Sequence, residues 1–249
     1  MANNAPESYG AFAYAYDQAL GRRFFRAARR MLLRSLEEHP PAEKTHLDLA
    51  CGTGYAVELF TERGFASTGV DLSITMLTMA TRRARRRVAG DLRALPLRAT
   101  FARITCLYDS LNHMKEHGDL VAAFRAAASV MNRDSLFLFD MNHPEIYPEI
   151  WGSALPFVAS GADFRLEIAT RFRDGIGHAR VSGWAKLGGK RIGIRETHEQ
   201  RAWSEAEIGG ALADAGLEIV SVENFDPYNE AEVIDAPTVK LFFTVSKLR

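Results

Sequence analysis

An acidic residue stands just ahead of two glycines in the segment Leu47-Asp48-Leu49-Ala50-Cys51-Gly52-Thr53-Gly54. Because Gly52 and Gly54 lack side chains, the backbone between them can approach a bound ligand closely. The third glycine of the dinucleotide pattern G-x-G-x-x-G is missing, since Val57 stands in its place. Asp48 would repel a pyrophosphate but attract a cation. The segment therefore predicts a binding loop for a positively charged ligand.

Two further acidic residues follow the next predicted strands. Asp71 ends the second strand, where a carboxylate can accept hydrogen bonds from both hydroxyls of a ribose. Asp91 and Leu92 follow the third, where a carboxylate can accept from the amine of adenine and a backbone N–H can reach a ring nitrogen. One such acid alone is more often a turn or cap residue. Three at successive strand ends favour an adenosyl ligand, and S-adenosylmethionine, with a sulfonium, an ammonium and no phosphate, has the matching charge.

A parallel sheet is the structure that would bring these strand ends together, because ligands of open α/β sheets bind at the carboxyl edge. Short apolar runs alternate with helical patterns through the first half of the chain, which favours a βαβαβ series. The expected strands are 45–50, 66–71, 87–90, 102–107 and 135–140, and the expected helices are 22–38, 54–63, 73–85 and 120–131.

The pattern changes after residue 150. Three stretches of two-residue alternation, 163–173, 178–186 and 191–203, are separated by Asp174-Gly175 and Gly188-Gly189, which predicts an antiparallel meander. A helix with the capping box Ser204–Glu207 and the C-terminal Gly216 follows. Strands at 217–223 and 238–246 bring the main sheet to seven. We predict four segments: 1–40 as an N-terminal lid and helix, 41–150 as the cofactor-binding core, 151–203 as a β insertion covering the acceptor, and 204–249 as completion of the core.

Composition narrows the class of protein. The chain has 249 residues, 47% of them hydrophobic, and its 31 basic and 31 acidic side chains give a net charge of +0. This predicts an ordinary globular enzyme or binding domain, without general attraction to nucleic acid. No apolar run approaches the length of a membrane span, and the first residues do not resemble a signal peptide.

The two cysteines, Cys51 and Cys106, are interpreted as reduced thiols, so we expect a cytoplasmic protein without membrane contact. His113 and His117 have a metal-ligand spacing, but no further ligand accompanies them, and no metal is expected.

Residues 45–110 resemble the cofactor-binding half of class I S-adenosylmethionine-dependent methyltransferases, in the D-x-A-C-G-T-G loop, the acid ending strand two and the Gly-Asp-Leu before the adenine site. The segment Leu107-Tyr108-Asp109-Ser110-Leu111-Asn112-His113-Met114 is similar to the motif after strand four of small-molecule N-methyltransferases, such as glycine and amino-sugar N-methyltransferases. Tyr14-Ala15-Tyr16-Asp17 resembles the N-terminal lid of that group. The resemblance implies a Rossmann-like, mostly parallel sheet whose last strand is antiparallel, with the insertion after strand five.

The resemblance also implies roles for single residues. Asp109 would lie near the methionine end of the cofactor. One of Arg22, Arg23 and Arg26 would bind the carboxylate of the cofactor, and Arg23 is the candidate we select. Tyr16 would close over the reacting methyl group, and His113 would face the acceptor. From the residues alone, a packed aromatic beside Phe12 is the favoured interpretation of Tyr16, and His113 is equally a loop histidine bonded to backbone. The remaining expected cofactor contacts are Asp48, Ala50, Cys51, Gly52, Gly54, Asp71, Leu72, Asp91, Leu92 and Leu107.

The predicted function is methyl transfer from S-adenosylmethionine to a small-molecule amine or hydroxyl by in-line displacement. Four aromatic residues are candidates for the walls around the acceptor: Trp151, Phe157, Trp184 and Trp203. RNA or protein methylation is an alternative that would need a contiguous basic face. A non-catalytic module that only binds the cofactor is another. The lid and the insertion could each serve as the surface of a homodimer. The usual proline-glycine-glycine turn before strand five is replaced by Asn132-Arg133-Asp134-Ser135, which should alter that loop but not the site.

Overall fold

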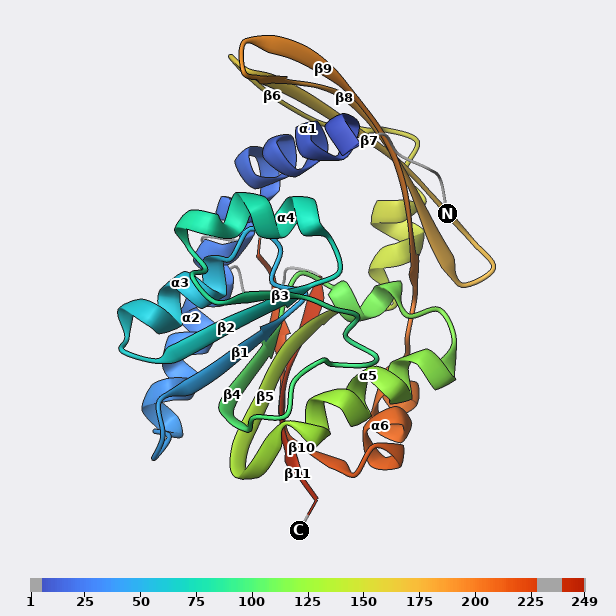
Figure 1. The fold of residues 1–249 in the computed structure, drawn as a ribbon. Helices are drawn as coiled ribbons and strands as arrows, with labels where there is room; N and C mark the ends of the chain where they lie inside the picture. The colour runs from blue at the N-terminus through green and yellow to red at the C-terminus, as the bar shows by residue number, and fades with distance from the viewer. Residues whose placement is uncertain (1–5, 228–238, 249) are drawn as a thin grey trace.

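The computed structural model describes residues 6–227 and 239–248, and its centre is a seven-stranded sheet (Figure 1). The strands stand in the order β10-β11-β5-β4-β1-β2-β3. Strands β1 to β5 are parallel, and β11 runs antiparallel to β5 and β10. The bounds are β1 Thr45–Leu49, β2 Ala66–Asp71, β3 Arg87–Ala89, β4 Phe101–Cys106, β5 Met131–Asn142, β10 Leu217–Phe225 and β11 Lys240–Lys247. The predicted Rossmann-like methyltransferase sheet with an antiparallel last strand is confirmed.

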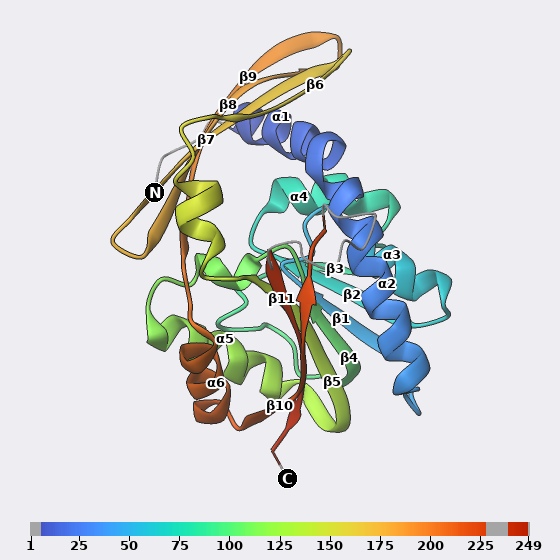
Figure 2. The same cartoon turned by 180° about the vertical axis from the view of Figure 1, so that it is seen from behind.

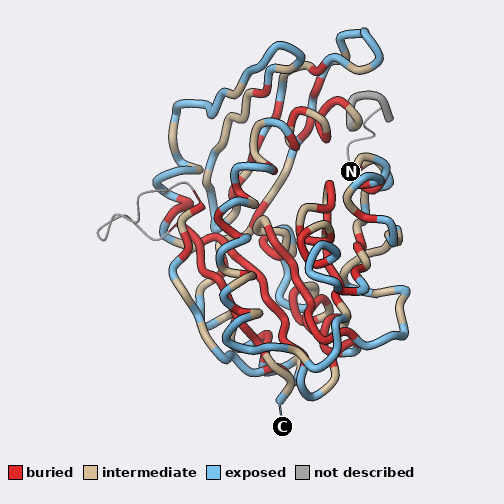
Figure 3. Tube along the Cα trace, turned by 90° about the vertical axis from the view of Figure 1, so that its left-hand side faces the viewer, coloured by how far each residue is buried: buried red, intermediate tan, exposed pale blue. Residues whose placement is uncertain are grey.

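Helices cover both faces of this sheet (Figures 1 and 2). On one face, α2 (Arg22–Glu38) and α3 (Tyr55–Glu62) bury Phe24, Leu32 and Phe60. On the other, α5 (His117–Ser129) and α6 (Glu205–Asp214) bury Phe124 and Leu212. Figure 3 shows the buried chain running through the strands between these layers. The core is therefore formed by apolar helix faces spaced three or four residues apart, packed on a sheet with both sides covered.

A second sheet of four antiparallel strands stands beyond the carboxyl ends of the parallel strands, and α1 (Pro6–Tyr16) packs against it (Figure 1). Its strands are β6 Phe157–Gly161, β7 Phe164–Arg173, β8 Ile176–Leu187 and β9 Lys190–Arg201. Phe12 on α1 packs with Leu166, Val181 and Ile194 of this sheet. The hairpin turns are Asp174-Gly175 and Gly188-Gly189, all four residues with positive φ, as predicted.

Some boundaries differ from the prediction. Strand β6 was not predicted, because this edge strand is mostly exposed and shows no clear alternation. The helix after β2, α4, spans only Ile74–Met79 and continues as the short 3-10 turn Ala80–Arg82. Strand β5 begins at Met131 and thus includes the segment predicted as a loop, where the Ser135 hydroxyl donates to the carbonyl of Phe101 at 2.7 Å. The last strand begins at Lys240, and the predicted first residue, Thr238, lies outside the described residues.

Two other local features bear on the termini of helices. The capping box at the start of α6 is present: the Ser204 hydroxyl accepts from the backbone of Glu207, whose carboxylate accepts from the backbone of Ser204. At the other end of the chain, α1 continues into α2 through one turn of π-helix, Asp17–Gly21.

Among the described helices, none has the length and apolar character needed to cross a bilayer.

Candidate functional site

The carboxyl ends of β1 and β4 hold three non-glycine residues in left-handed backbone conformations. Ala50 has φ 52°, Tyr108 has φ 67° and Asp109 has φ 47°. Each such residue costs about 1–3 kcal/mol and persists only where its surroundings impose it, most often at ligand sites. Because β1 and β4 are neighbours in the sheet, these strained turns lie side by side at its carboxyl edge. The edge predicted from the sequence is thus also the strained part of the backbone.

The two glycines of the first turn serve different purposes. Gly52 has φ 52°, and a Cβ built there would meet no atom within 4 Å, so its backbone borders open space. Gly54 has φ 89°, and a Cβ there would lie 3.3 Å from the Cβ atoms of Ala84 and Arg83. Gly52 therefore leaves room for a ligand, whereas Gly54 allows the chain after α4 to pack closely. This open cradle fits the adenosyl ligand expected from the sequence.

Asp71 is held against the cradle by two backbone donors. One carboxylate oxygen accepts from the N–H of Gly52 at 2.8 Å and the other from the N–H of Ser73, also at 2.8 Å. Burial raises the pKa of this carboxyl, and the two N–H groups oppose that rise. Its orientation is therefore fixed at the end of β2, as a ribose-binding carboxylate requires. The neighbouring Leu72 is 73% exposed, an unusual exposure for a leucine beside a binding loop.

Asp48 lies beneath the same turn and is only 3% exposed. Its carboxylate accepts a hydrogen bond from the Thr105 hydroxyl of β4 at 2.5 Å. Burial raises the pKa of Asp48 to about 7, with a smaller contribution from the negative charge of Asp71. Cys51 is buried beside them, and its backbone N–H donates to the carbonyl of Val70 at 2.9 Å. Because the charged form of a buried acid is disfavoured, a positive charge on a nearby ligand would stabilise the Asp48 carboxylate.

Asp91 differs from the other two acids. Its carboxylate binds Arg93 from its own turn, through the backbone N–H at 2.8 Å and the guanidinium Nε at 3.1 Å from each oxygen. Arg93 lowers the pKa of Asp91 and also pairs with Asp119 at 2.9 Å. Leu92 is half-buried against the core. In the unliganded structure Asp91 is thus a turn residue in an ion pair, and an adenine amine would have to share its carboxylate with Arg93.

The second strained turn rests on a buried group of charges. Lys240 of β11 forms ion pairs with Asp109 and with Asp140 of β5, the latter at 3.0 Å. Asp140 also accepts from the backbone N–H groups of Tyr108 at 2.6 Å and Asp109 at 3.0 Å. Lys240 holds the pKa of Asp109 below its usual range. The left-handed conformations of Tyr108 and Asp109 are therefore imposed by a carboxylate that Lys240 neutralises.

Gln200 of β9 connects this group to His113. Its amide nitrogen donates to Asp109 and lies 3.4 Å from His113 Nε2, while its oxygen accepts from Asn142 at 2.9 Å and from the Tyr147 hydroxyl at 3.2 Å. Two donors on the oxygen fix which end of the amide faces His113. The insertion thus contributes an inward-pointing side chain to the carboxyl edge of the main sheet.

His113 is presented as a neutral base. Its Nδ1 lies 2.9 Å from the carbonyl of Glu199, which can only accept, so Nδ1 carries the proton, and the unprotonated Nε2 faces the amide nitrogen of Gln200 at 3.4 Å. Surrounding protein lowers the pKa of His113 by desolvation, with the charge of Asp109 opposing. His113 is nevertheless exposed. The contact with backbone, which was the alternative interpretation of His113, is present, and its role toward an acceptor stays a prediction.

Aromatic rings extend from Tyr16 to this histidine. The Tyr16 ring lies 5.6 Å from that of Tyr108 and 5.7 Å from that of Phe12. Phe12 lies 5.3 Å from His198 of β9, whose ring is 6.1 Å from that of His113. Burial lowers the pKa of His198 to about 4, so it is neutral as well. The structure therefore brings together the N-terminal helix, the turn after β4 and the insertion, from which Tyr16 and His113 were predicted to act.

The role of Arg22, Arg23 or Arg26 toward the cofactor carboxylate stays a prediction. Arg22, Arg23 and Arg26 are exposed on α2. The arginine at the turn is Arg83, which donates to Asp17 at 2.9 Å and lies 3.4 Å from the carbonyl of Thr53.

Two of the four candidate aromatic residues, Trp203 and Trp184, pack in the core and on the outer face of the insertion. Trp203 is completely buried in the core, where its indole N–H donates to the carbonyl of Met114 at 2.9 Å. Trp184 lies on the opposite face of the insertion from α1, with the Arg191 guanidinium 4.0 Å from its ring. Trp151 packs on Tyr147 at 5.4 Å, and Phe157 is exposed on the edge strand β6. Sequence alternation identified inward positions, but it could not say which ring lies over the site.

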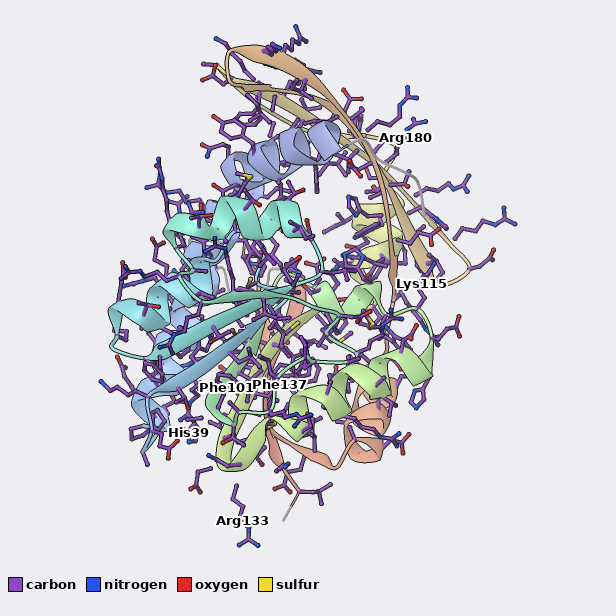
Figure 4. All side chains as sticks on the ribbon, in the orientation of Figure 1. His39, Phe101, Lys115, Arg133, Phe137 and Arg180 are labelled. Carbon is purple, nitrogen blue, oxygen red and sulfur yellow. The ribbon has the colours of Figure 1, made fainter. Side chains whose placement is uncertain are left out.

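Basic side chains gather on the outer face of the insertion. Arg180, Arg191 and Arg195 are exposed there, on the side of the sheet away from α1, where Figure 4 labels Arg180. Gln200 points to the opposite face, toward Asp109. A polyanion bound to this basic face would therefore not meet His113 directly. His117, the second histidine of the predicted pair, lies 3.2 Å from Asp214, and within residues 6–227 and 239–248 no group of three potential ligands could hold a metal ion.

Comparisons with known proteins agree with this geometry. Residues 47–134, from β1 into β5, match a model described as a methyltransferase domain. A dTDP-3-amino-3,6-dideoxy-alpha-D-glucopyranose N,N-dimethyltransferase of Streptomyces fradiae is 27% identical over 221 residues, with 84% of this chain and 85% of that protein covered. A cypemycin N-terminal methyltransferase of a Streptomyces species is 27% identical over 194 residues, covering 76% and 78%.

Solved structures agree in fold. The crystal structure of an S-adenosylmethionine-dependent methyltransferase from Clostridium acetobutylicum superimposes with a TM-score of 0.79 at 24% identity, covering 96% of this chain and 98% of that chain. DesVI of Streptomyces venezuelae superimposes with a TM-score of 0.75 at 22% identity, with the same coverage. Together with the glycine cradle and the acids at the strand ends, these matches support an S-adenosylmethionine-dependent methyltransferase of class I that resembles amino-sugar N-methyltransferases.

Proposed function

We propose that the protein methylates a small-molecule amine or hydroxyl. The observation that supports this proposal is the neutral His113, whose unprotonated Nε2 lies 3.4 Å from the Gln200 amide nitrogen, in a side chain oriented by Asn142 and Tyr147. An acceptor amine arrives mainly as its ammonium at neutral pH and must lose a proton before it can attack. A histidine with a lowered pKa is available for that proton across the physiological range.

The cofactor supplies a methyl group already activated on a sulfonium. We propose that Asp71 binds the ribose hydroxyls, that Asp91 and Leu92 meet the adenine, and that Leu72 packs beside it. Asp48 would neutralise positive charge on the cofactor, near the methionine end that Asp109 approaches. The backbones of Ala50, Cys51, Gly52, Gly54 and Leu107 would form the cradle, and Arg23 stays the candidate for the carboxylate, with Arg22 and Arg26 as alternatives.

Tyr16 and His113 act on the acceptor side of this arrangement. Tyr16, packed between Phe12 and Tyr108, would cover the methyl group and exclude water. Alignment of two bound reactants can supply roughly 7–11 kcal/mol of the barrier reduction, so most of the catalysis would come from holding the acceptor in line. The part of the insertion that reaches the site, Gln200 with His198, would orient the acceptor.

The names of the relatives suggest an acceptor class. One methylates an amino group of a nucleotide-linked sugar, and another the N-terminus of a peptide, and both acceptors are amines. We propose an amine on a small polar molecule such as an amino sugar. RNA methylation and a binding-only module remain alternatives, but the basic face of the insertion lies away from His113, which favours the small acceptor.

A transfer assay with a labelled methyl group tests this function. The purified protein would be incubated with labelled S-adenosylmethionine and, separately, with amino sugars, simple amines, phenols, peptides and tRNA. We expect label in the amines. Label only in tRNA or protein would refute the small-molecule proposal, and binding of the cofactor without transfer to any acceptor would favour the binding module.

His113→Ala is expected to lower kcat by about 100-fold or more, because a positioned base typically contributes that factor. Affinity for S-adenosylhomocysteine, measured by calorimetry, should change little. In the wild type, kcat/KM should fall only below a pH that is lower than the usual histidine value, since a lowered pKa keeps His113 neutral to more acidic pH. His117→Ala, on an exposed histidine of α5, is the matched control. Lost cofactor binding with undiminished turnover at saturation would contradict the role as base.

A further inference from the structure

Four buried polar side chains form a hydrogen-bonded row across three adjacent strands beneath the glycine turn. The Thr105 hydroxyl of β4 donates to Asp48 of β1 at 2.5 Å. Thr105 also lies 3.0 Å from His46 Nε2, and His46 Nδ1 lies 2.5 Å from the Ser67 hydroxyl of β2. All four side chains are buried, and His46 and Thr105 are completely so. The row thus runs from the cofactor edge into the middle of the sheet.

Strand register explains why these residues meet. His46 and Asp48 are two residues apart on β1 and therefore point to the same face. His46 is paired with Ser67 across to β2, and Asp48 with Thr105 across to β4. That face is covered by α3, where the imidazole stacks on Phe60 at 3.7 Å. A parallel strand covered on both faces normally carries apolar residues. Burying these polar side chains costs stability, so a contribution to folding does not explain why they are here.

The direction of each hydrogen bond follows from the ionised carboxylate. An ionised Asp48 only accepts, so the single hydroxyl proton of Thr105 must point to it. Thr105 can then only accept from His46, which places the imidazole proton on Nε2. His46 Nδ1 is left to accept from the Ser67 hydroxyl. The imidazole is neutral because complete burial lowers the pKa of His46 well below its ordinary value.

Among the residues that the structure describes, no cation contributes to the pKa shift of Asp48. The facing titratable groups are Asp71 of β2, Cys51 after β1 and Cys106 of β4, besides His46. Burial raises the pKa of both thiols, so both are neutral, and Asp71 adds a negative charge. Within the described part of the chain, Thr105 is the hydrogen-bond donor to the Asp48 side chain. The hydroxyl therefore has a large influence on whether Asp48 carries its charge.

We infer that Thr105 and His46 are positioning residues for the cofactor. The hydrogen bonds from Ser67 through His46 direct the hydroxyl proton of Thr105 toward Asp48. This keeps the Asp48 carboxylate ionised, so that it can receive the positive charge of S-adenosylmethionine. The inference rests on the proposed cofactor contact of Asp48. It goes beyond it by assigning a binding role to residues that cannot touch the cofactor, since His46 is completely buried in the sheet.

Calorimetric titration over a range of pH tests this inference, with S-adenosylmethionine and with S-adenosylhomocysteine, which keeps the ammonium but lacks the sulfonium. Thr105→Val keeps the shape of the side chain but removes the hydroxyl, and we expect about tenfold or greater loss of affinity near neutral pH, the size of one hydrogen bond to a charged group. Because Asp48 would then ionise only at higher pH, the affinity should recover as pH rises. Thr105→Ser restores the hydroxyl and should bind like the wild type.

His46 offers a second matched pair. His46→Leu removes the donor to Thr105 and should shift the pH dependence in the same direction as Thr105→Val. In His46→Gln a side-chain amide can replace the Nε2–H, and most of the affinity should return. Nitrogen NMR of the wild-type complex at a pH above the Asp48 transition should show His46 protonated on Nε2. Protonation on Nδ1 would overturn the inference, and so would unchanged pH profiles in folded Thr105→Val and His46→Leu.

Asp48→Asn separates this failure from failure of the proposed function. If Asp48→Asn binds S-adenosylhomocysteine as tightly as the wild type, the cofactor contact of Asp48 itself is wrong. If Asp48→Asn loses binding while Thr105→Val and His46→Leu keep wild-type affinity at every pH, only the row is refuted. Far-ultraviolet circular dichroism establishes that each variant is folded before its affinity is compared.

Discussion

Asp48→Asn is expected to weaken cofactor binding by about 100-fold or more while making the unliganded protein more stable, since truncating a buried charge partner typically costs this much affinity. The stabilisation arises because the folded protein binds the Asp48 proton more tightly than the unfolded chain. With a pKa of about 7 in the fold against 3.8 as the ordinary value, ionisation at higher pH costs the folded state up to about 4 kcal/mol. Asparagine can still accept from Thr105 but never ionises.

The sign of the pH dependence makes this prediction specific. A raised pKa in the fold means that Asp48 lowers the stability of the wild type as pH rises, with the full cost reached above about pH 7. The variant should therefore exceed the wild type in urea unfolding at about pH 8, and the difference should shrink toward about pH 5. Asp163→Asn, at an exposed turn of the insertion, is the control and should show no such trend. Equal stability at both pH values would contradict the buried, destabilising charge.

The arrangement proposed to bind the cofactor was predictable because its signals are local. The glycine turn, Asp48 and Asp71 each stand at a strand end that the apolar pattern marks, and parallel strands necessarily bring their carboxyl ends to one edge. Asp91 shows the limit of this reasoning. Nothing in the spacing of Asp91 indicates that Arg93, two residues later, folds back on it, because that depends on the side-chain conformation of one turn.

The acceptor half depends on contacts between distant parts of the sequence. Lys240 meets Asp109 across 131 positions, and Gln200 meets Asp109 across 91. Alternation in β9 marks Gln200 as inward-facing, but only the packing of the insertion against the main sheet shows what it faces. His46 and Thr105 carried a clearer signal, since polar residues at inward positions of buried strands are unusual. Their partners, however, follow from the register of neighbouring strands, which the sequence pattern does not determine.

These contacts link the insertion to the cofactor edge. Gln200 joins β9 to Asp109, Asp109 shares Lys240 with Asp140, and Asp140 holds the strained turn after β4. Thr105, which bonds Asp48, precedes that turn on the same strand. Movement of the insertion on binding an acceptor would therefore be transmitted to the turn at which the methionine end of the cofactor is expected.

Lys240→Met is expected to destabilise the protein by about 3–5 kcal/mol, the usual cost of removing one partner from a buried ion pair. The Lys240 side chain is 4% exposed and Asp140 is completely buried, so methionine would leave two carboxylates near each other without a cation. Burial already raises the pKa of Asp140, and loss of the lysine would raise it further. The penalty should therefore decrease as pH falls, because protonation removes the unpaired charge.

Urea unfolding at several pH values measures this effect. The matched control is Lys247→Met, on the same strand as Lys240. It removes an ammonium that donates to the carbonyl of Met131 at 3.0 Å, and it should cost about 1 kcal/mol or less of stability. Adding Asp140→Asn to Lys240→Met removes one of the unpaired charges, so the double variant should recover part of the lost stability. A penalty for Lys240→Met that is no larger than the control, or that does not change with pH, would show that the charge of Lys240 does not support the turn holding Asp109.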